Sequence, residues 1–221
     1  MIKPYYQDEA VTIYHADCRD ILPQLSQVEL ILTDPPYGKR WARGMNAFGD
    51  IRHLAEKIEN LNWDKERPTK DCFDLMIKGS KEQIIFGGNY FTDYLYPTNC
   101  WLVWDKKGDS FNGNPMADCE LVWTSFSKVV KKYKFIQQGF INESHDNRLH
   151  PTQKPRELIE SILLDFSLVS DIILDPFMGS GTILRAAKNL NRKAIGIEIE
   201  EKYCEIAANR CRQSVMELRI C

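Results

Sequence analysis

The chain has 221 residues, of which 43% are hydrophobic and 27% charged, and its formal net charge is −2. This composition is typical of a globular protein and excludes a disordered tail, a collagen-like fibre and a low-complexity scaffold. No apolar run reaches the roughly 18 residues that a membrane helix needs, and the first residues lack the apolar centre of a secretion signal. We therefore expect a cytoplasmic protein that does not bind membranes.

Short apolar runs rich in branched or aromatic residues predict a series of β-strands. Because the runs are nearly continuous, they indicate strands buried on both faces, as in a sheet flanked by helices. In chain order the predicted strands are 10–14, 28–33, 83–86, 100–104, 120–123, 171–174 and 193–199.

Helical periodicity is clearest in the last third of the chain. Apolar residues recur at three- and four-residue spacing over 158–166, 183–190 and 203–215, and Pro155 stands where a first helical turn tolerates proline. Strand, helix, strand and helix from residue 171 onward form a βαβα unit, which predicts an α/β fold with a parallel sheet there. We expect a single domain over 1–221, with the polar segment 38–70 as a loop or small helical insertion.

The seven cysteines are scattered, and neither they nor the four histidines show the spacing of metal ligands. The sequence therefore predicts no metal site and no disulfide framework.

A glycine-rich turn, DPFMGSGT at 175–182, lies between a predicted strand and a predicted helix. Such a turn lets backbone N–H groups approach a ligand closely, and a helix N-terminus favours an anion. Glu198 ends the next strand, where an acid commonly accepts hydrogen bonds from ribose hydroxyls. A tight connection in an unrelated α/β protein is the alternative, but the two strands and the acid favour nucleoside binding. A nicotinamide cofactor is not expected, because no third glycine follows at the dinucleotide spacing.

The tetrapeptide Asp34-Pro35-Pro36-Tyr37 closes the strand predicted at 28–33. Two prolines fix the backbone and remove two N–H donors, so the turn presents the Asp34 carboxylate and nearby carbonyls as acceptors beside an aromatic ring. Acceptors of this kind suit a nucleobase with an exocyclic amino group, which could stack on Tyr37 for roughly 1–3 kcal/mol. The alternative is a rigid turn whose tyrosine packs on the core.

The two motifs together resemble the amino-methyltransferases of DNA, which use S-adenosylmethionine. DPPY precedes the glycine turn, as in the permuted group called the beta class. Residues 150–155, HPTQKP, resemble the segment that lines the methionine end of the cofactor in that class, and Ala16-Asp17-Cys18 resembles its G-D-C element, with alanine in place of glycine. The resemblance implies a doubly wound, mostly parallel, circularly permuted Rossmann-like sheet with a small insertion after the DPPY strand.

The resemblance also implies site residues. It assigns catalysis to Asp34, Pro35, Pro36 and Tyr37. In this assignment Asp34 and the Pro35 carbonyl accept the two hydrogens of the target amino group. The residues assigned to the cofactor are Asp17, Cys18, Lys154, Pro155, Asp175, Pro176, Phe177, Gly179, Ser180, Gly181, Thr182 and Glu198.

Double-stranded DNA is the expected partner, and the target base must be flipped out of the helix to reach the site. Seven basic residues against two acids over 125–156 could face a polyanion, although a solvated surface explains such an excess equally well. The residues expected to contact nucleic acid are Lys39, Arg40, Arg43, Lys131, Lys132, Lys134 and Arg148.

Several functional alternatives remain open. Methylation of cytosine at N4 uses the same geometry, although serine in place of Asp34 is its usual signature; methylation at carbon 5 is excluded because no cysteine follows a proline. An RNA substrate and a non-catalytic nucleic-acid-binding subunit are further alternatives. Little room between the tetrapeptide and the HPTQKP segment predicts a short or relaxed target read by 38–70 and 125–147. The resemblance to small members of the family implies no obligatory restriction partner, and a homodimer is a further expectation.

Overall fold

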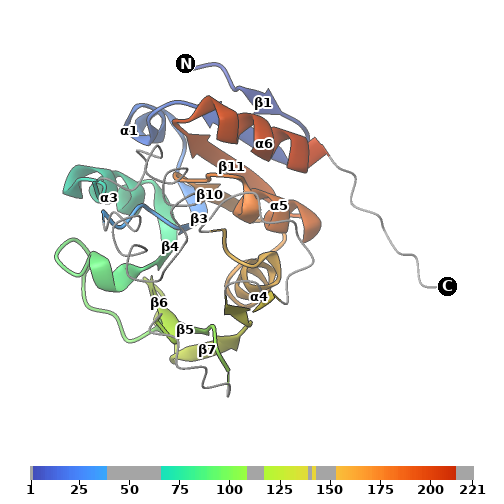
Figure 1. Cartoon of the computed structure of the whole chain (residues 1–221). Helices are drawn as coiled ribbons and strands as arrows, with labels where there is room; N and C mark the ends of the chain where they lie inside the picture. The colour runs from blue at the N-terminus through green and yellow to red at the C-terminus, as the bar shows by residue number, and fades with distance from the viewer. Residues whose placement is uncertain (1, 39–65, 109–116, 139–140, 143–152, 213–221) are drawn as a thin grey trace, which may run out of the picture.

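The computed structural model describes residues 2–38, 66–108, 117–138, 141–142 and 153–212. A nine-stranded sheet runs through the described part of the chain in the order β1-β2-β11-β10-β3-β4-β6-β5-β7 (Figure 1). Its strands are β1 (Tyr6–Gln7), β2 (Val11–His15), β3 (Val28–Thr33), β4 (Ser80–Phe86), β5 (Trp101–Asp105), β6 (Cys119–Thr124), β7 (Lys131–Lys134), β10 (Ile172–Asp175) and β11 (Lys193–Glu198). Two further strands, β8 (Gln137–Gln138) and β9 (Ile141–Asn142), form a separate hairpin.

The middle of the sheet is parallel. β2, β11, β10, β3 and β4 pair in parallel, whereas β6 runs antiparallel to both β4 and β5. β1 and β7 close the two edges, β1 antiparallel to β2 and β7 parallel to β5. The expected α/β fold with a mostly parallel sheet is therefore confirmed.

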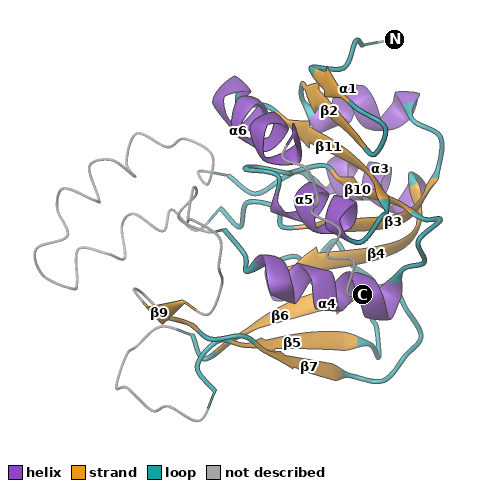
Figure 2. Cartoon of the chain, turned by 90° about the vertical axis from the view of Figure 1, so that its right-hand side faces the viewer, coloured by secondary structure: helices purple, strands orange, loops and turns teal. Residues whose placement is uncertain are grey.

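Helices cover both faces of the sheet (Figure 2). α4 (Arg156–Phe166), α5 (Thr182–Asn189) and α6 (Glu201–Arg212) cover one face, and α1 (Cys18–Ile21) and α3 (Lys70–Lys78) cover the other. Side chains alternate between the two layers: Leu30 and Leu32 of β3 join the cluster under α4–α6, while Ile31 joins the cluster under α1 and α3. Strands buried on both faces were thus predicted correctly from their apolar runs.

Some boundaries differ from those predicted. β4 starts three residues earlier than the apolar run at 83–86, because its first residues, Ser80 to Glu82, are polar and carry no apolar signal. α4 begins at Arg156, so Pro155 lies one position before the helix and not within its first turn. The insertion 38–70 falls mostly outside the described residues, and α3 begins at its last residue. Two 3₁₀ turns, η1 (Leu22–Gln24) and η5 (Gly88–Tyr90), complete the elements.

Among the described residues, no helix is both long and apolar enough to cross a membrane.

Candidate active site

Both sequence motifs lie at the same edge of the sheet. The DPPY turn follows β3 and the glycine turn follows β10; these strands are parallel neighbours in which Ile31 pairs with Leu174. The Thr33 hydroxyl donates a buried hydrogen bond of 2.7 Å to Asp175 Oδ1, which ties the residue before the tetrapeptide to the first residue of the glycine turn. This hydrogen bond joins residues that are 142 positions apart in the sequence. It lies at the carboxyl ends of parallel strands, where α/β sheets commonly bind ligands.

Two donors hold the Asp34 carboxylate. The Tyr37 hydroxyl donates to Oδ1 at 2.6 Å, and the Lys154 ammonium donates to Oδ2 at 2.5 Å. Asp34 is half-buried and Pro35 is buried, so the turn fixes the carboxylate at the edge of the sheet without sealing it from solvent. This is the corner at which the sequence places catalysis.

Tyr37 contributes to the corner and also packs on the core. Its ring lies against Tyr90, with the ring centroids 4.8 Å apart, and against Phe91 at 6.1 Å. Gly87 makes this packing possible, because a Cβ there would lie 2.3 Å from the Tyr37 ring. Burial and the nearby Asp34 raise the pKa of Tyr37 well above its usual value, so its hydroxyl stays protonated and donates to Asp34. Packing and polar roles, which the sequence offered as alternatives, coexist in this residue.

Lys154 connects the corner to a residue that the sequence did not indicate. Its ammonium donates to Asp34 and also lies 3.4 Å from Glu120 Oε2. The other oxygen of Glu120, Oε1, accepts from Lys106 at 2.7 Å. Burial alone would lower the pKa of Lys154, but the two carboxylates outweigh it and raise the value. Burial would likewise raise the pKa of Glu120, but Lys154 and Lys106 bring it below its usual value. Lys154 and Glu120 are therefore both charged.

The glycine turn is shaped around Glu198. The backbone N–H groups of Gly179 and Glu200 donate to the Glu198 carboxylate at 3.0 and 2.8 Å, and burial raises the pKa of that carboxyl. Gly179 and Gly181 have φ of +49° and +76°, a region that favours glycine. A Cβ on Gly181 would lie 2.7 Å from Ala207 Cβ, whereas one on Gly179 would meet no described atom within 4 Å. A side chain is therefore excluded at Gly181 by Ala207, whereas the space beside Gly179 is open among the described residues.

Further hydrogen bonds hold the backbone of the glycine turn in place, and they involve both predicted and unpredicted residues. Arg210 of α6 donates to the Ser180 carbonyl at 2.9 Å and to the Thr182 hydroxyl at 3.1 Å, and no sequence pattern predicted it. Asp175 is buried and accepts from Thr33 and from the Phe177 N–H, and burial raises its pKa to about 7. Pro176 is buried beside these residues.

The Ala16-Asp17-Cys18 element reaches the same edge. The Ala16 N–H donates to the Glu198 carbonyl at 3.0 Å, which places Asp17 next to the end of β11. Asp17 caps α1 by accepting from the Arg19 N–H at 2.9 Å, while the Cys18 thiol is buried 3.4 Å from that of Cys72. The structure therefore brings Asp17 and Glu198 together.

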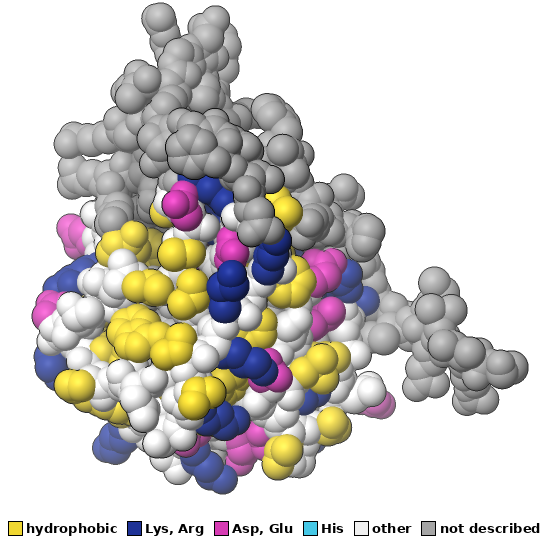
Figure 3. Space-filling model, turned by 90° about the horizontal axis from the view of Figure 1, so that it is seen from below, with side chains coloured by type: hydrophobic (Ala, Val, Ile, Leu, Met, Phe, Trp, Pro, Cys, Tyr) yellow, Lys and Arg dark blue, Asp and Glu magenta, His cyan; other side chains and the backbone are white. Residues whose placement is uncertain are grey.

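Only some of the basic residues predicted to contact nucleic acid lie in the described part of the chain. Lys39, Arg40, Arg43 and Arg148 lie outside the described residues, as do Trp41 and Trp63. In β7, Lys131 pairs with Asp165 and Lys132 with Asp105, so acids balance part of the expected excess. On the face nearest β5 and β7, Lys and Arg alternate with acidic and hydrophobic side chains (Figure 3). Lys134, which ends β7, lies at the sheet edge that carries Asp34.

Comparison with known proteins identifies the family. A family model described as DNA methylase matches residues 92–209, more than half of the chain. The chain belongs to the DNA methylase family. The predicted family, fold and enzyme class are confirmed, and S-adenosylmethionine is the cofactor of this DNA methylase.

Relatives and solved structures match nearly the whole DNA methylase. The type II methyltransferase M2.LlaDCHI of Lactococcus lactis subsp. cremoris is 26% identical over 95% of this chain and 92% of its own. The fold resembles that of M1.HpyAVI, solved as a complex with S-adenosylmethionine, with a TM-score of 0.58 and 24% identity over 92% of this chain and 100% of the other. It also resembles the cytosine-N4-specific PvuII DNA methyltransferase, with a TM-score of 0.65 and 16% identity over 97% of this chain and 91% of the other.

A matched pair of glycine substitutions tests the shape of the cofactor turn. Gly179→Ala adds a methyl group that meets no described atom and stands where the turn is open, so we expect it to weaken S-adenosylmethionine binding. Its stability cost should be only about 1–2 kcal/mol, the cost of a left-handed backbone for a residue with a Cβ. Gly181→Ala forces a collision with Ala207 and should lower the melting temperature markedly more. Thermal melting and calorimetric titration of both variants check this. Equal melting temperatures, or unchanged affinity in Gly179→Ala, would contradict it.

Proposed function

We propose that this DNA methylase transfers a methyl group to the exocyclic N6 of an adenine flipped out of double-stranded DNA. The observation that carries the proposal is the Asp34 carboxylate, held between Tyr37 and Lys154 and tied through Thr33 to the glycine turn. A carboxylate at this position, where N4-cytosine enzymes more usually carry serine, favours adenine.

The chain supplies acceptors and alignment. S-adenosylmethionine supplies a methyl group bonded to a positively charged sulfur. Asp34 and the Pro35 carbonyl accept the two hydrogens of the amino group, which draws its nitrogen toward tetrahedral geometry and frees the lone pair. Alignment of two reactants in this way can contribute roughly 7–11 kcal/mol, and most of the acceleration has to come from it.

The position of Asp34 at the edge of the sheet supports base flipping, since a base stacked inside a duplex would not reach it. Extrusion costs a few kcal/mol, which contacts in the pocket offset in part. The Tyr37 hydroxyl contacts the carboxylate and its ring packs on Tyr90, so these two rings are our candidates for stacking on the flipped base. Lys134 and the basic residues at 39, 40, 43 and 148 are our candidates for phosphate contacts.

We also propose that the insertion 38–70 and the region 125–147 read a short target, and that the enzyme needs no restriction partner. The short stretch between the tetrapeptide at 34–37 and the segment 150–155 supports the short target, because it leaves little room there for a large recognition domain. Light scattering will show whether the protein is a monomer or a homodimer. Sequencing of DNA from expressing cells will test the target: methylation confined to a long, strict motif would contradict this proposal.

Methylation of cytosine at N4 is the second candidate, because the fold resembles that of a cytosine-N4-specific enzyme. To decide, the protein is incubated with labelled S-adenosylmethionine and separate pools of DNA and RNA, and the modified nucleoside is identified by mass. We expect N6-methyladenine from DNA. N4-methylcytosine would move the assignment to the second candidate, label in RNA alone would overturn DNA as the substrate, and cofactor binding without transfer would indicate a non-catalytic subunit.

A further inference from the structure

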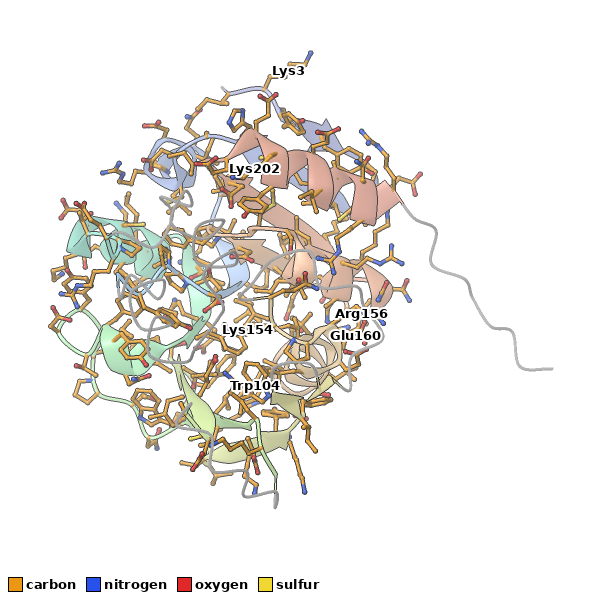
Figure 4. The ribbon with its side chains drawn as sticks, viewed as in Figure 1. Lys3, Trp104, Lys154, Arg156, Glu160 and Lys202 are labelled. Carbon is orange, nitrogen blue, oxygen red and sulfur yellow. The ribbon has the colours of Figure 1, made fainter. Side chains whose placement is uncertain are left out.

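A chain of alternating charges leads away from the catalytic corner. The Lys154 ammonium is placed between the carboxylates of Asp34 and Glu120, at 2.5 and 3.4 Å, and Lys106 holds the other oxygen of Glu120 at 2.7 Å. Two carboxylates and two ammonium groups cancel, so the array has no net charge. Lys154 is 8% exposed and is labelled near the middle of the molecule in Figure 4, whereas Lys3 lies at its edge.

The topology explains why Glu120 reaches this corner. Glu120 stands near the start of β6, and β6 runs antiparallel to β4 and β5. The start of β6 therefore lies at the edge where β3 and β4 end, which brings Glu120 within reach of Lys154.

One atom of the array, Glu120 Oε2, is ion-paired with Lys154 at 3.4 Å but lacks a hydrogen bond. Glu120 Oε2 is shielded from solvent and accepts no hydrogen bond from any residue that the structure describes. A shielded carboxylate oxygen without a donor is unfavourable by about 1–3 kcal/mol or more. Because the Lys154 ammonium is 3.4 Å away, a small rotation of that side chain would supply the missing donor.

Asp34, in contrast, has a donor on each oxygen. Its Oδ1 accepts from Tyr37 and its Oδ2 from Lys154. An oxygen already bound to an ammonium accepts a further hydrogen bond less well, so release of the Lys154 contact would make Oδ2 a better acceptor for the incoming amino group. Lys154 cannot simply give up this contact, because a buried ammonium without a partner is strongly destabilising. A second carboxylate within reach removes this obstacle.

We propose that Glu120 is a positioning residue that takes over Lys154 when the target amino group binds Asp34. This inference rests on the proposed function. The Lys154 hydrogen bond passes from Asp34 Oδ2 to Glu120 Oε2, and Asp34 Oδ2 then accepts a hydrogen of the amino group. During transfer the new N–C bond forms as the S–C bond breaks, and the surplus proton on nitrogen passes to Asp34 and then to water. Glu120 keeps Lys154 paired throughout.

The test compares Glu120→Gln, Lys154→Met and the double variant. Single-turnover methylation of plasmid DNA from a host without DNA methylation is measured at saturating S-adenosylmethionine, so that changes in cofactor affinity do not enter. Glu120→Gln leaves Lys154 on Asp34 and should slow transfer about ten- to a hundredfold, the value of a hydrogen bond to a charged group. Lys154→Met in the Glu120→Gln background removes the competing ammonium, so the double variant should be faster than Glu120→Gln alone.

Rising pH provides a second readout. Glu120 and Asp34 together raise the pKa of Lys154 against the effect of burial, so loss of the Glu120 charge lowers that pKa. A neutral amine holds Asp34 more weakly than an ammonium does. The ratio of wild-type to Glu120→Gln rates should therefore shrink as pH increases. A double variant no faster than Glu120→Gln, together with a loss that is constant with pH, would overturn the inference and leave Glu120 a structural residue.

Glu29→Gln is the matched control, because Glu29 is a carboxylate of the same sheet that pairs with Lys81 away from the corner. It should keep the wild-type rate. If Glu120→Gln fails to fold, Glu120→Asp with and without Lys154→Met is compared in the same way, and a lack of relief there overturns the inference equally. Failure of the wild-type chain to methylate DNA would instead remove the proposed function itself.

Discussion

Replacement of Asp34 by alanine is expected to slow methyl transfer by roughly 10²–10⁴-fold, the range typical for removal of a group that handles the reacting proton. The carboxylate is the acceptor at the end of β3, and alanine leaves the amino group without the partner that frees its lone pair. S-adenosylmethionine affinity should change little, because the glycine turn and Glu198 keep their hydrogen bonds with each other. Single-turnover rates and calorimetric titration measure the two effects separately.

Two further variants make this result interpretable. Asp34→Asn keeps the size of the side chain but offers one acceptor oxygen, so it should fall between wild type and alanine. Asp74→Ala breaks only an exposed pair with Lys70 on α3 and should keep full activity. A near-normal rate in Asp34→Ala would remove Asp34 from the mechanism.

Glu198→Ala is expected to weaken S-adenosylmethionine binding about ten- to a hundredfold. It leaves the backbone N–H groups of Gly179 and Glu200 without their charged acceptor and removes the predicted ribose acceptor. The rate at saturating cofactor should fall much less, because Asp34 and Lys154 are untouched. Titration calorimetry gives the dissociation constant directly.

Glu200→Ala is the control for this prediction. The Glu200 side chain is exposed and lies 3.7 Å from Lys202, while only its backbone N–H serves Glu198. The alanine variant should bind the cofactor as wild type does. An unchanged dissociation constant in Glu198→Ala would refute the ribose assignment.

The meeting of the two motifs could be predicted from local patterns. Apolar runs ended at Asp34 and near Asp175, and parallel neighbours end at one edge of a sheet, so the motifs had to lie close together if their strands paired. The two edge strands could not be predicted in this way. β1 has two residues, and β7 reads KKYK, whose one apolar side chain gives no alternation to detect.

The partners of the site were also beyond sequence reasoning. Lys154 was assigned to the cofactor by resemblance, whereas the structure shows its ammonium on Asp34, 120 residues away. Glu120 begins an apolar strand and belongs to no motif, and Arg210 is one of several charged residues on α6. The partners of these side chains depend on the direction of β6 and the position of α6 in the folded protein, which local sequence patterns do not give.

The hydrogen bond between Thr33 and Asp175 has a consequence for synthesis of the chain. A ribosome releases β3 long before β10, so on one side β3 has no neighbour until more than 140 further residues have emerged. Such an uncovered edge can pair with other chains, and long-range parallel pairing is slow. The nascent polypeptide thus carries its catalytic tetrapeptide early but completes the enzyme only when its last strands insert, and truncated translation products will be inert and prone to aggregate.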